Sequence, residues 1–197
     1  MKEVVIVDSG GANLASLRYA LERLGAHVAV SADAQAIAAA ERVVLPGVGA
    51  AARAMQRLSG AGLTEVLLRL GQPVLGVCLG MQLLCAHSAE GDTGCLGVLP
   101  YPVRELQSAP GRPVPHMGWN RLRRLRADAL LEDIPDGEYV YFVHSYGAAV
   151  TPDTLAAADY GGAWSAVMRR GNFCGTQFHP ERSGAAGARL LGNFLRL

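Results

Sequence analysis

One cysteine stands in a sequence setting that suits a nucleophile. Cys78 lies in Gly76-Val77-Cys78-Leu79-Gly80, where an apolar run predicts a strand before it and a periodic pattern predicts a helix after it. This is the thiol version of the G-x-S-x-G nucleophile elbow, in which small residues on either side let strand and helix approach. A helix N-terminus also favours thiolate over thiol. We predict that Cys78 is a nucleophile, and we interpret Cys85, Cys95 and Cys174 as buried structural cysteines.

A thiol nucleophile needs a base, and one of the five histidines has the best sequence context. His179 lies in Phe178-His179-Pro180-Glu181, where proline favours an extended conformation and residues two apart project to the same side. Glu181 can then orient the imidazole while the other ring nitrogen serves Cys78, as in a catalytic triad. The alternative is a surface turn, and the other histidines are His27, His87, His116 and His144.

The loop Leu45-Pro46-Gly47-Val48-Gly49 follows a predicted strand and can present backbone N–H groups to an oxyanion. The same letters allow a rival interpretation, because residues 47–52 also fit the dinucleotide pattern G-x-G-x-x-A. That pattern expects an acidic residue at the end of a second strand. Glu65, at about the right distance, lies inside a helical pattern, so the oxyanion interpretation is favoured.

The elements that must hold these residues alternate in the first half of the chain. Strands are predicted at 4–7, 28–30, 42–45 and 74–77, and helices at 14–24, 33–40, 51–58, 63–70 and 79–86. In the second half, β-like segments at 98–106, 139–143, 164–168 and 173–178 precede a helix at 185–195. We expect one α/β domain over 1–197, with a mostly parallel twisted central sheet flanked by helices and a mixed or antiparallel β extension.

Composition excludes several classes of protein. The 197 residues are 50% hydrophobic, which supports a sizeable core and excludes general disorder. Lys and Arg number 18 against 17 Asp and Glu, so no global charge favours nucleic acid or an anionic membrane. No apolar run approaches the roughly 20 residues of a transmembrane helix, and no signal-peptide pattern follows Met1. The four cysteines lack CxxC spacing, so we expect a reduced, cytoplasmic protein.

Two further segments have plain interpretations. The stretch from Arg121 to Arg126 carries four arginines in six residues without interleaved aromatics. It is more simply a solvated strand face or an interface rim than a nucleic-acid site. Residues 107–115, with four Gly or Pro breakers, predict a surface loop.

Five blocks of sequence together are typical of one known family. They are Pro46-Gly47-Val48-Gly49, Gly76-Val77-Cys78-Leu79-Gly80-Met81-Gln82, His116-Met117-Gly118-Trp119-Asn120, Tyr141-Phe142-Val143-His144-Ser145-Tyr146 and Gln177-Phe178-His179-Pro180-Glu181-Arg182-Ser183-Gly184. With these blocks the chain resembles the class I, triad-type glutamine amidotransferases, and within them the glutaminase subunits of imidazole glycerol phosphate synthases. The resemblance covers nearly the whole chain. One block departs, because the family usually begins with D-Y-G-x-G-N-L and this chain has Ser9 for Tyr and Ala12 for Gly, while Asn13 is retained.

The resemblance implies a reaction and roles for residues. Cys78 would attack the carboxamide of glutamine, His179 would protonate the departing ammonia, and water would hydrolyse the thioester, with Glu181 completing the triad. No metal or organic cofactor is implied. The residues implied to bind glutamine or its oxyanion are Val48, Gly49, Leu79, Gln82, Ser145 and Tyr146.

The resemblance also implies a partner, a (β/α)8-barrel cyclase subunit that uses the ammonia to make imidazole glycerol phosphate in histidine biosynthesis. The implied docking face includes Asn13, Met117, Trp119 and Tyr141. Two alternatives stay open: a class I amidotransferase subunit of another synthase, and an interaction module with a vestigial triad.

Overall fold

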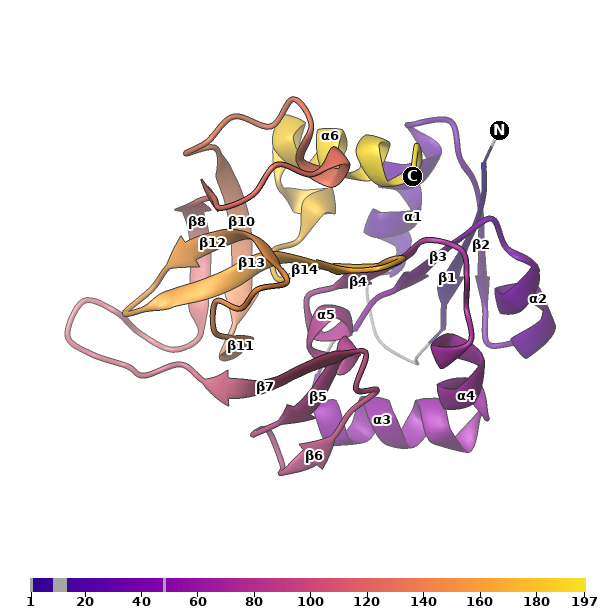
Figure 1. Cartoon of the computed structure of the whole chain (residues 1–197), viewed down its shortest axis with the longest axis horizontal. Coiled ribbons are helices and arrows are strands. Elements are labelled where there is room, and N and C mark those ends of the chain that lie inside the picture. The colour runs from indigo at the N-terminus through magenta and orange to yellow at the C-terminus, as the bar shows by residue number, and fades with distance from the viewer. Residues whose placement is uncertain (1, 9–13, 48) are drawn as a thin grey trace.

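A mixed sheet of eight strands forms the centre of the molecule (Figure 1). The computed structural model describes residues 2–8, 14–47 and 49–197. In the order β2-β1-β3-β4-β14 the strands are parallel to their neighbours, and β13, β12 and β9 extend the sheet in antiparallel fashion. The strands are β1 (Glu3–Val7), β2 (His27–Ser31), β3 (Arg42–Leu45), β4 (Val74–Val77), β9 (Arg123–Arg124), β12 (Thr154–Asp159), β13 (Ala163–Arg170) and β14 (Phe173–Thr176).

Helices cover both faces of this sheet because its inner strands are apolar on both sides. In β1, Val4 and Ile6 face one core and Val5 and Val7 face the other. The first core packs against α1 (Leu14–Glu22) and α6 (Gly184–Phe194), and the second against α2 (Ala34–Ala39), α3 (Ala51–Gly60) and α4 (Leu63–Leu68). Within the described part of the chain, no helix is long and apolar enough to cross a membrane.

Two smaller sheets stand beside the central one at the carboxyl end of β4 (Figure 1). One has the strand order β11-β7-β5-β6 and the other is the antiparallel pair of β10 and β8. Between β4 and β5 lies the short helix α5 (Leu79–Leu84). The strands are β5 (Cys85–Ser88), β6 (Thr93–Gly94), β7 (Leu99–Glu105), β8 (His116–Arg121), β10 (Tyr139–His144) and β11 (Tyr146–Ala148), and the 3-10 helices are η1 (Ala129–Leu131) and η2 (Pro180–Arg182).

The predicted fold class is confirmed: the parallel strands with helices on both faces come first, and the antiparallel extension comes from the second half. Each predicted strand and helix overlaps an observed one, with ends that differ by a few residues. The residues 107–115 lie, as predicted, in the connection between β7 and β8.

The predicted helix at 79–86 is wrong at its end, because α5 stops at Leu84 and β5 begins at Cys85. The backbone of Cys85 is extended, and its carbonyl accepts a hydrogen bond from the N–H of Gly97. Pairing with β7 therefore overrides the helical pattern there. The sequence also failed to predict β8, which pairs with β10, and β12, which pairs with β13 and β9.

Candidate active site

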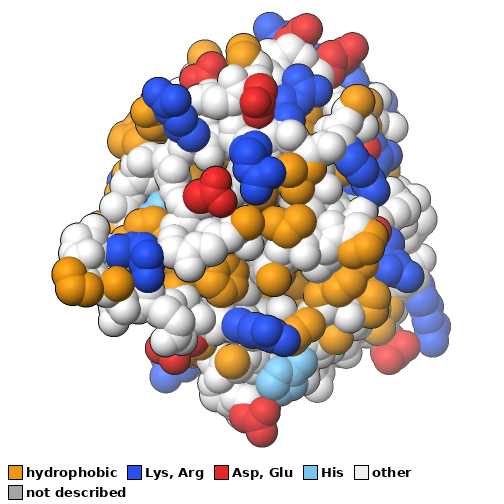
Figure 2. All heavy atoms as spheres, turned by 60° about the vertical axis from the view of Figure 1, so that its left-hand side comes forward, with side chains coloured by type: hydrophobic (Ala, Val, Ile, Leu, Met, Phe, Trp, Pro, Cys, Tyr) orange, Lys and Arg blue, Asp and Glu red, His pale blue; other side chains and the backbone are white. Residues whose placement is uncertain are grey.

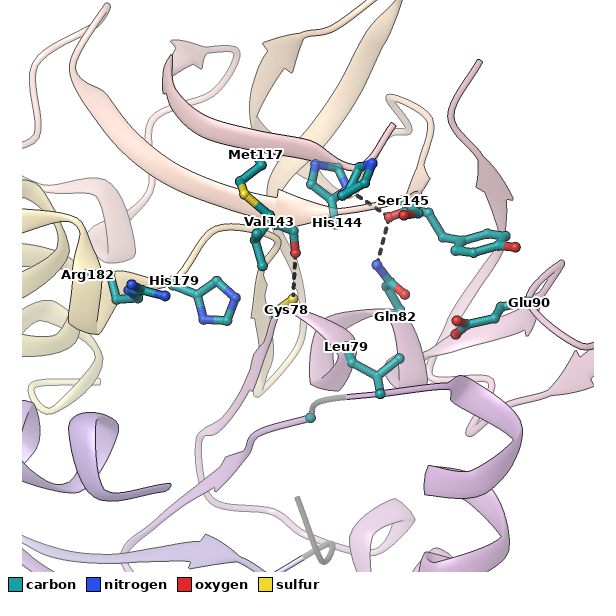
Figure 3. Close-up of a pocket in the computed structure, with 14 residues that line it drawn as sticks. Cys78, Leu79, Gln82, Glu90, Met117, Val143, His144, Ser145, His179 and Arg182 are labelled. Carbon is teal, nitrogen blue, oxygen red and sulfur yellow. Dashed lines mark hydrogen bonds between the residues drawn. The ribbon is translucent and has the colours of Figure 1, made fainter. Parts of the chain in front are cut away.

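Cys78 occupies a strained turn between β4 and α5. Its backbone angles are φ 53° and ψ −110°, a region that residues with a side chain rarely adopt. The residue is 9% exposed, and its thiol donates to the carbonyl oxygen of Val143 across 3.7 Å (Figure 3). The turn therefore directs the sulfur away from the sheet and toward the end of β10.

The two glycines of this turn are required by packing. A Cβ on Gly76 would lie 2.7 Å from the carbonyl oxygen of Gly80. A Cβ on Gly80 would lie 1.8 Å from the carbonyl oxygen of Leu45, at the end of β3. Both contacts are with backbone, which cannot rotate away. The close approach of strand and helix that the G-x-C-x-G spacing predicts is therefore present.

We expect Gly80→Ala to destabilise the protein by about 3 kcal/mol or more, because the neighbouring backbone must shift. Gly60→Ala is the matched control, since Gly60 also lies in a helix and a Cβ there meets nothing within 4 Å. That control should change stability by less than about 1 kcal/mol. Urea denaturation of both variants measures the difference, and equal midpoints would contradict the packing argument.

His179 and Glu181 form a buried pair beside the thiol. Nδ1 of His179 lies 2.9 Å from Oε1 of Glu181, and the two side chains are 14% and 5% exposed. The ring projects toward Cys78 in Figure 3. Its Nε2 is buried and makes no hydrogen bond to the described part of the chain. Nδ1 therefore binds the carboxylate of Glu181, and Nε2 lies on the side of the Cys78 thiol.

The charge state of His179 follows from these neighbours. Burial acts to lower the pKa of His179, but hydrogen bonding and charge interaction with the sulfur of Cys78 and the carboxylate of Glu181 outweigh it and raise the pKa to about 10. The imidazolium form is therefore stabilised at this position. Such a shift at a pocket residue is typical of a functional site.

Strand β10 fixes the segment that carries the histidine. The N–H of His179 donates to the carbonyl of Tyr141 across 3.0 Å. The hydroxyl of Ser183 accepts from the N–H of Tyr141 at 2.9 Å and donates to the carbonyl of His179 at 2.7 Å. The bend that begins η2 is thereby tied to β10 from two directions, so the position of the imidazole depends on that strand.

Cys78 and His179 line one pocket of about 440 Å³, large enough for an amino acid (Figure 3). An amide network crosses its wall. Nε2 of Gln82 donates to the carbonyl of Tyr146 at 2.7 Å and to Oε1 of Gln177 at 2.9 Å, and Nε2 of Gln177 donates to the sulfur of Cys78 at 3.8 Å. The remaining lining residues are Gly47, Gly49, Leu79, Glu90, Pro115, Met117, Val143, His144, Ser145 and Arg182.

Comparison with known proteins agrees with this geometry. The profile of the family "Glutamine amidotransferase class-I" matches residues 5–197. The chain belongs to this amidotransferase family. It is 55% identical over 197 residues to imidazole glycerol phosphate synthase subunit HisH of Xylella fastidiosa (strain Temecula1), with 100% of this chain and 98% of the relative covered. The protein of the same name from Xanthomonas campestris pv. campestris is 56% identical over the same shares.

Solved structures support the fold of the amidotransferase. PurLQS from Thermotoga maritima superimposes with a TM-score of 0.74 at 22% identity, over 100% of this chain and 99% of that one. A structure described as a glutamine amidotransferase gives a TM-score of 0.75 at 19% identity, over 98% and 97% of the two chains. At these identities the likeness concerns the fold alone.

Most of the residues predicted for the site lie together in the amidotransferase pocket. Glu181 lies behind His179 and does not line it, as expected for an orienting carboxylate. Val48, and Asn13 on the predicted docking face, fall outside the described residues. The predicted residues that line the pocket are Cys78, Leu79, Gly49, Gln82, Ser145, Tyr146 and His179.

Sequence reasoning missed four residues at the site. Gln177 and Ser183 both lie in the block around His179, and alternation along an extended segment could have indicated Gln177, which precedes His179 by two positions. Arg182 lines the pocket from η2. Glu90 lines it from the turn after β5, and no local pattern in the sequence points to it.

The dinucleotide interpretation finds no support in the amidotransferase. Glu65 lies inside the helix α4, as its helical pattern predicts, and pairs with Arg69 at 3.6 Å with both side chains exposed. Among the described residues, no group of three or more His, Cys, Asp or Glu side chains is arranged to hold a metal ion.

Proposed function

We propose that this amidotransferase hydrolyses glutamine to glutamate and ammonia, with Cys78, His179 and Glu181 as its catalytic residues. The observation that carries the proposal is the pocket that brings an elbow cysteine and a buried His–Glu pair together. The thiol of Cys78 gives its proton to Nε2 of His179 and the thiolate attacks the carboxamide carbon. The C–N bond of the tetrahedral adduct then breaks as the imidazolium returns the proton to the nitrogen, which leaves as ammonia. Water, deprotonated by His179, then displaces the thiolate from the glutamyl thioester.

The pocket supplies groups for the rest of the substrate. The proposed oxyanion donors are the backbone N–H of Leu79, at the start of α5, and the backbone N–H groups of Val48 and Gly49. The glutamine is held by Gln82 and by the backbone at Ser145 and Tyr146. One carboxylate oxygen of Glu90 accepts a hydrogen bond from the N–H of Ala51 at 2.8 Å. The negative charge of this carboxylate complements the α-ammonium group of glutamine.

We further propose that the chain works as a single cytoplasmic amidotransferase domain over 1–197, docked to a (β/α)8-barrel cyclase that consumes the ammonia for imidazole glycerol phosphate. The name of the 55% identical relative, imidazole glycerol phosphate synthase subunit HisH, supports the assignment to this synthase. The proposed docking face is the outer face of β8 and β10. There Met117 is 64% and Trp119 57% exposed, and Trp119 packs edge-on against Tyr141 at 5.8 Å.

Basic side chains border this face. The guanidinium of Arg121 lies 5.0 Å from the ring centre of Tyr139, and that of Arg182 lies 4.9 Å from the ring centre of Tyr141. On the side of the molecule shown in Figure 2, hydrophobic patches are interrupted by basic side chains. Met117 and Arg182 also line the pocket, so the docking face and the site of ammonia release adjoin.

The function is tested by steady-state release of glutamate from glutamine by the chain alone, with the cyclase, and with the cyclase plus its nucleotide substrate. We expect little activity alone and a strong rise in the full system, because coupling to an acceptor prevents loss of ammonia. Absence of glutamate in all three conditions would refute the proposed activity. Equal rates in all three would refute the coupling.

The proposed docking face also predicts how a substitution changes the affinity for the cyclase. Trp119→Ala should weaken binding to the cyclase by about 2 kcal/mol, which is roughly 30-fold in Kd, because exposed tryptophans at interface centres are common hot spots. Leu68→Ala is the control, since Leu68 is 41% exposed on α4 at the other side of the sheet. Calorimetric titration of each variant with the cyclase measures both, and equal affinities would exclude this face.

A further inference from the structure

Two buried histidines beside the pocket, His116 and His144, have no step in the proposed reaction. They face each other as cross-strand partners on β8 and β10, and they are 4% and 7% exposed. The ring of His116 is stacked between Phe142 at 4.8 Å and Tyr160 at 3.9 Å. Apolar side chains would pack there equally well, so the polar edges of the two rings call for an explanation.

Those polar edges form a continuous chain of hydrogen bonds. Nδ1 of His144 lies 2.8 Å from the carbonyl oxygen of Tyr146. Nε2 of His144 lies 3.1 Å from Nδ1 of His116. Nε2 of His116 lies 3.3 Å from Nδ2 of Asn120. Four residues are thus linked, from strand β8 to the segment that lines the pocket.

The backbone at both ends fixes the direction of this chain. A carbonyl only accepts, so Nδ1 of His144 carries a hydrogen and its Nε2 accepts from Nδ1 of His116. At the other end, the N–H of Arg121 donates to Oδ1 of Asn120 at 2.7 Å, so the amide nitrogen of Asn120 faces His116 and donates to it. Both ends require the same arrangement, in which each histidine is neutral with its hydrogen on Nδ1.

The chain of hydrogen bonds reaches the nucleophile Cys78 through the backbone carbonyl of Tyr146. The oxygen of Tyr146 accepts from His144 and also from Gln82, at 2.7 Å (Figure 3). Gln82 donates onward to Gln177, which donates to the sulfur of Cys78. Loss of the His144 donor leaves this carbonyl with a single donor and loosens the wall of the pocket at Ser145 and Tyr146.

We propose that His116 and His144 are positioning residues, a neutral, one-directional hydrogen-bond relay that holds the Tyr146 carbonyl and aligns the glutamine pocket with strand β8. The inference rests on the proposed hydrolysis of glutamine. The relay lies on the inner face of β8, and its outer face carries Met117 and Trp119. A displacement of β8 is therefore transmitted to the pocket wall. Burial lowers the pKa of both histidines to about 4, which keeps the relay uncharged near neutral pH.

The kinetic test compares His144→Asn with His144→Leu, side chains of nearly the same size. The Asn amide can still donate to the Tyr146 carbonyl, and Leu cannot. Assayed with the cyclase present, the Leu variant should have a KM for glutamine about tenfold above that of the Asn variant, with kcat changed much less. His27→Asn controls for general effects of losing a histidine, because His27 is an exposed side chain on β2. Equal KM values in the two His144 variants would overturn the proposal.

A spectroscopic test needs neither variant to be active. In the ¹⁵N-histidine-labelled full chain, His116 and His144 should both show the neutral Nδ1–H tautomer near neutral pH, with signals assigned by His116→Phe and His144→Asn. An Nε2–H tautomer or a charged ring at either position would overturn the relay. If the wild type gives these tautomers but releases no glutamate with the cyclase, the proposed function fails and the relay does not.

Discussion

Cys78→Ala is expected to remove glutamine hydrolysis altogether, with a fall in kcat on the order of 10⁶-fold, because no other group can form the thioester. Cys78→Ser should be nearly as inactive, since a hydroxyl beside an imidazolium that already carries its proton is a poor nucleophile. Both variants should fold and bind the cyclase, because the side chain lies in the pocket and the glycines set the turn.

The companion measurement is covalent labelling with an electrophilic glutamine analogue, followed by peptide mapping. Burial raises the pKa of Cys85 and Cys174 to about 12 and that of Cys95 to about 11. These three remain thiols near neutral pH, and thiolates are the reactive form. The adduct should therefore form on Cys78 alone. An adduct on any of the other three cysteines, or activity in Cys78→Ala, would refute the assignment.

The predictions from sequence succeeded where a local pattern carries the structure. The elbow at Cys78 needs only a strand, a helix and two small residues in one short segment, and the observed backbone matches it. The pairing of His179 with Glu181 likewise follows from their spacing around a proline. Cys95 is the partial exception among the predicted structural cysteines, because it is half-buried where Cys85 and Cys174 are buried.

The parts that failed depend on contacts that no local pattern specifies. Half of the residues of β12 are alanines, which favour helix, and it is a strand because β13 and β9 pair with it on both sides. Glu90 reaches the pocket only because β5 replaces the end of the predicted helix. Ser183 acts through the strand β10, whose position relative to η2 no local spacing specifies.

His179→Ala and Glu181→Gln should differ in the size of their effects. The alanine variant loses both proton transfers and should fall on the order of 10⁵- to 10⁶-fold in kcat, whereas loss of the orienting carboxylate should cost roughly one to two orders of magnitude less. Steady-state glutamate release with the cyclase present measures both, and circular dichroism verifies that each variant is folded. Equal losses would mean that Glu181 does more than orient the ring.

The pH dependence of stability and of activity distinguishes two roles of Glu181, which are to orient the ring of His179 and to stabilise its charged form. The pKa of His179 is about 10 in the folded protein against an ordinary 6.5, so protonated His179 stabilises the fold below pH 6.5 and this stabilisation is lost as the pH rises toward 10. Glu181→Gln removes a carboxylate that raises the pKa, so it should flatten the dependence of stability on pH in that window. The same substitution should move the alkaline limb of the pH–rate profile to lower pH, because the imidazolium that protonates ammonia then loses its proton sooner. An unchanged limb, with activity reduced, would show that Glu181 acts by orientation alone.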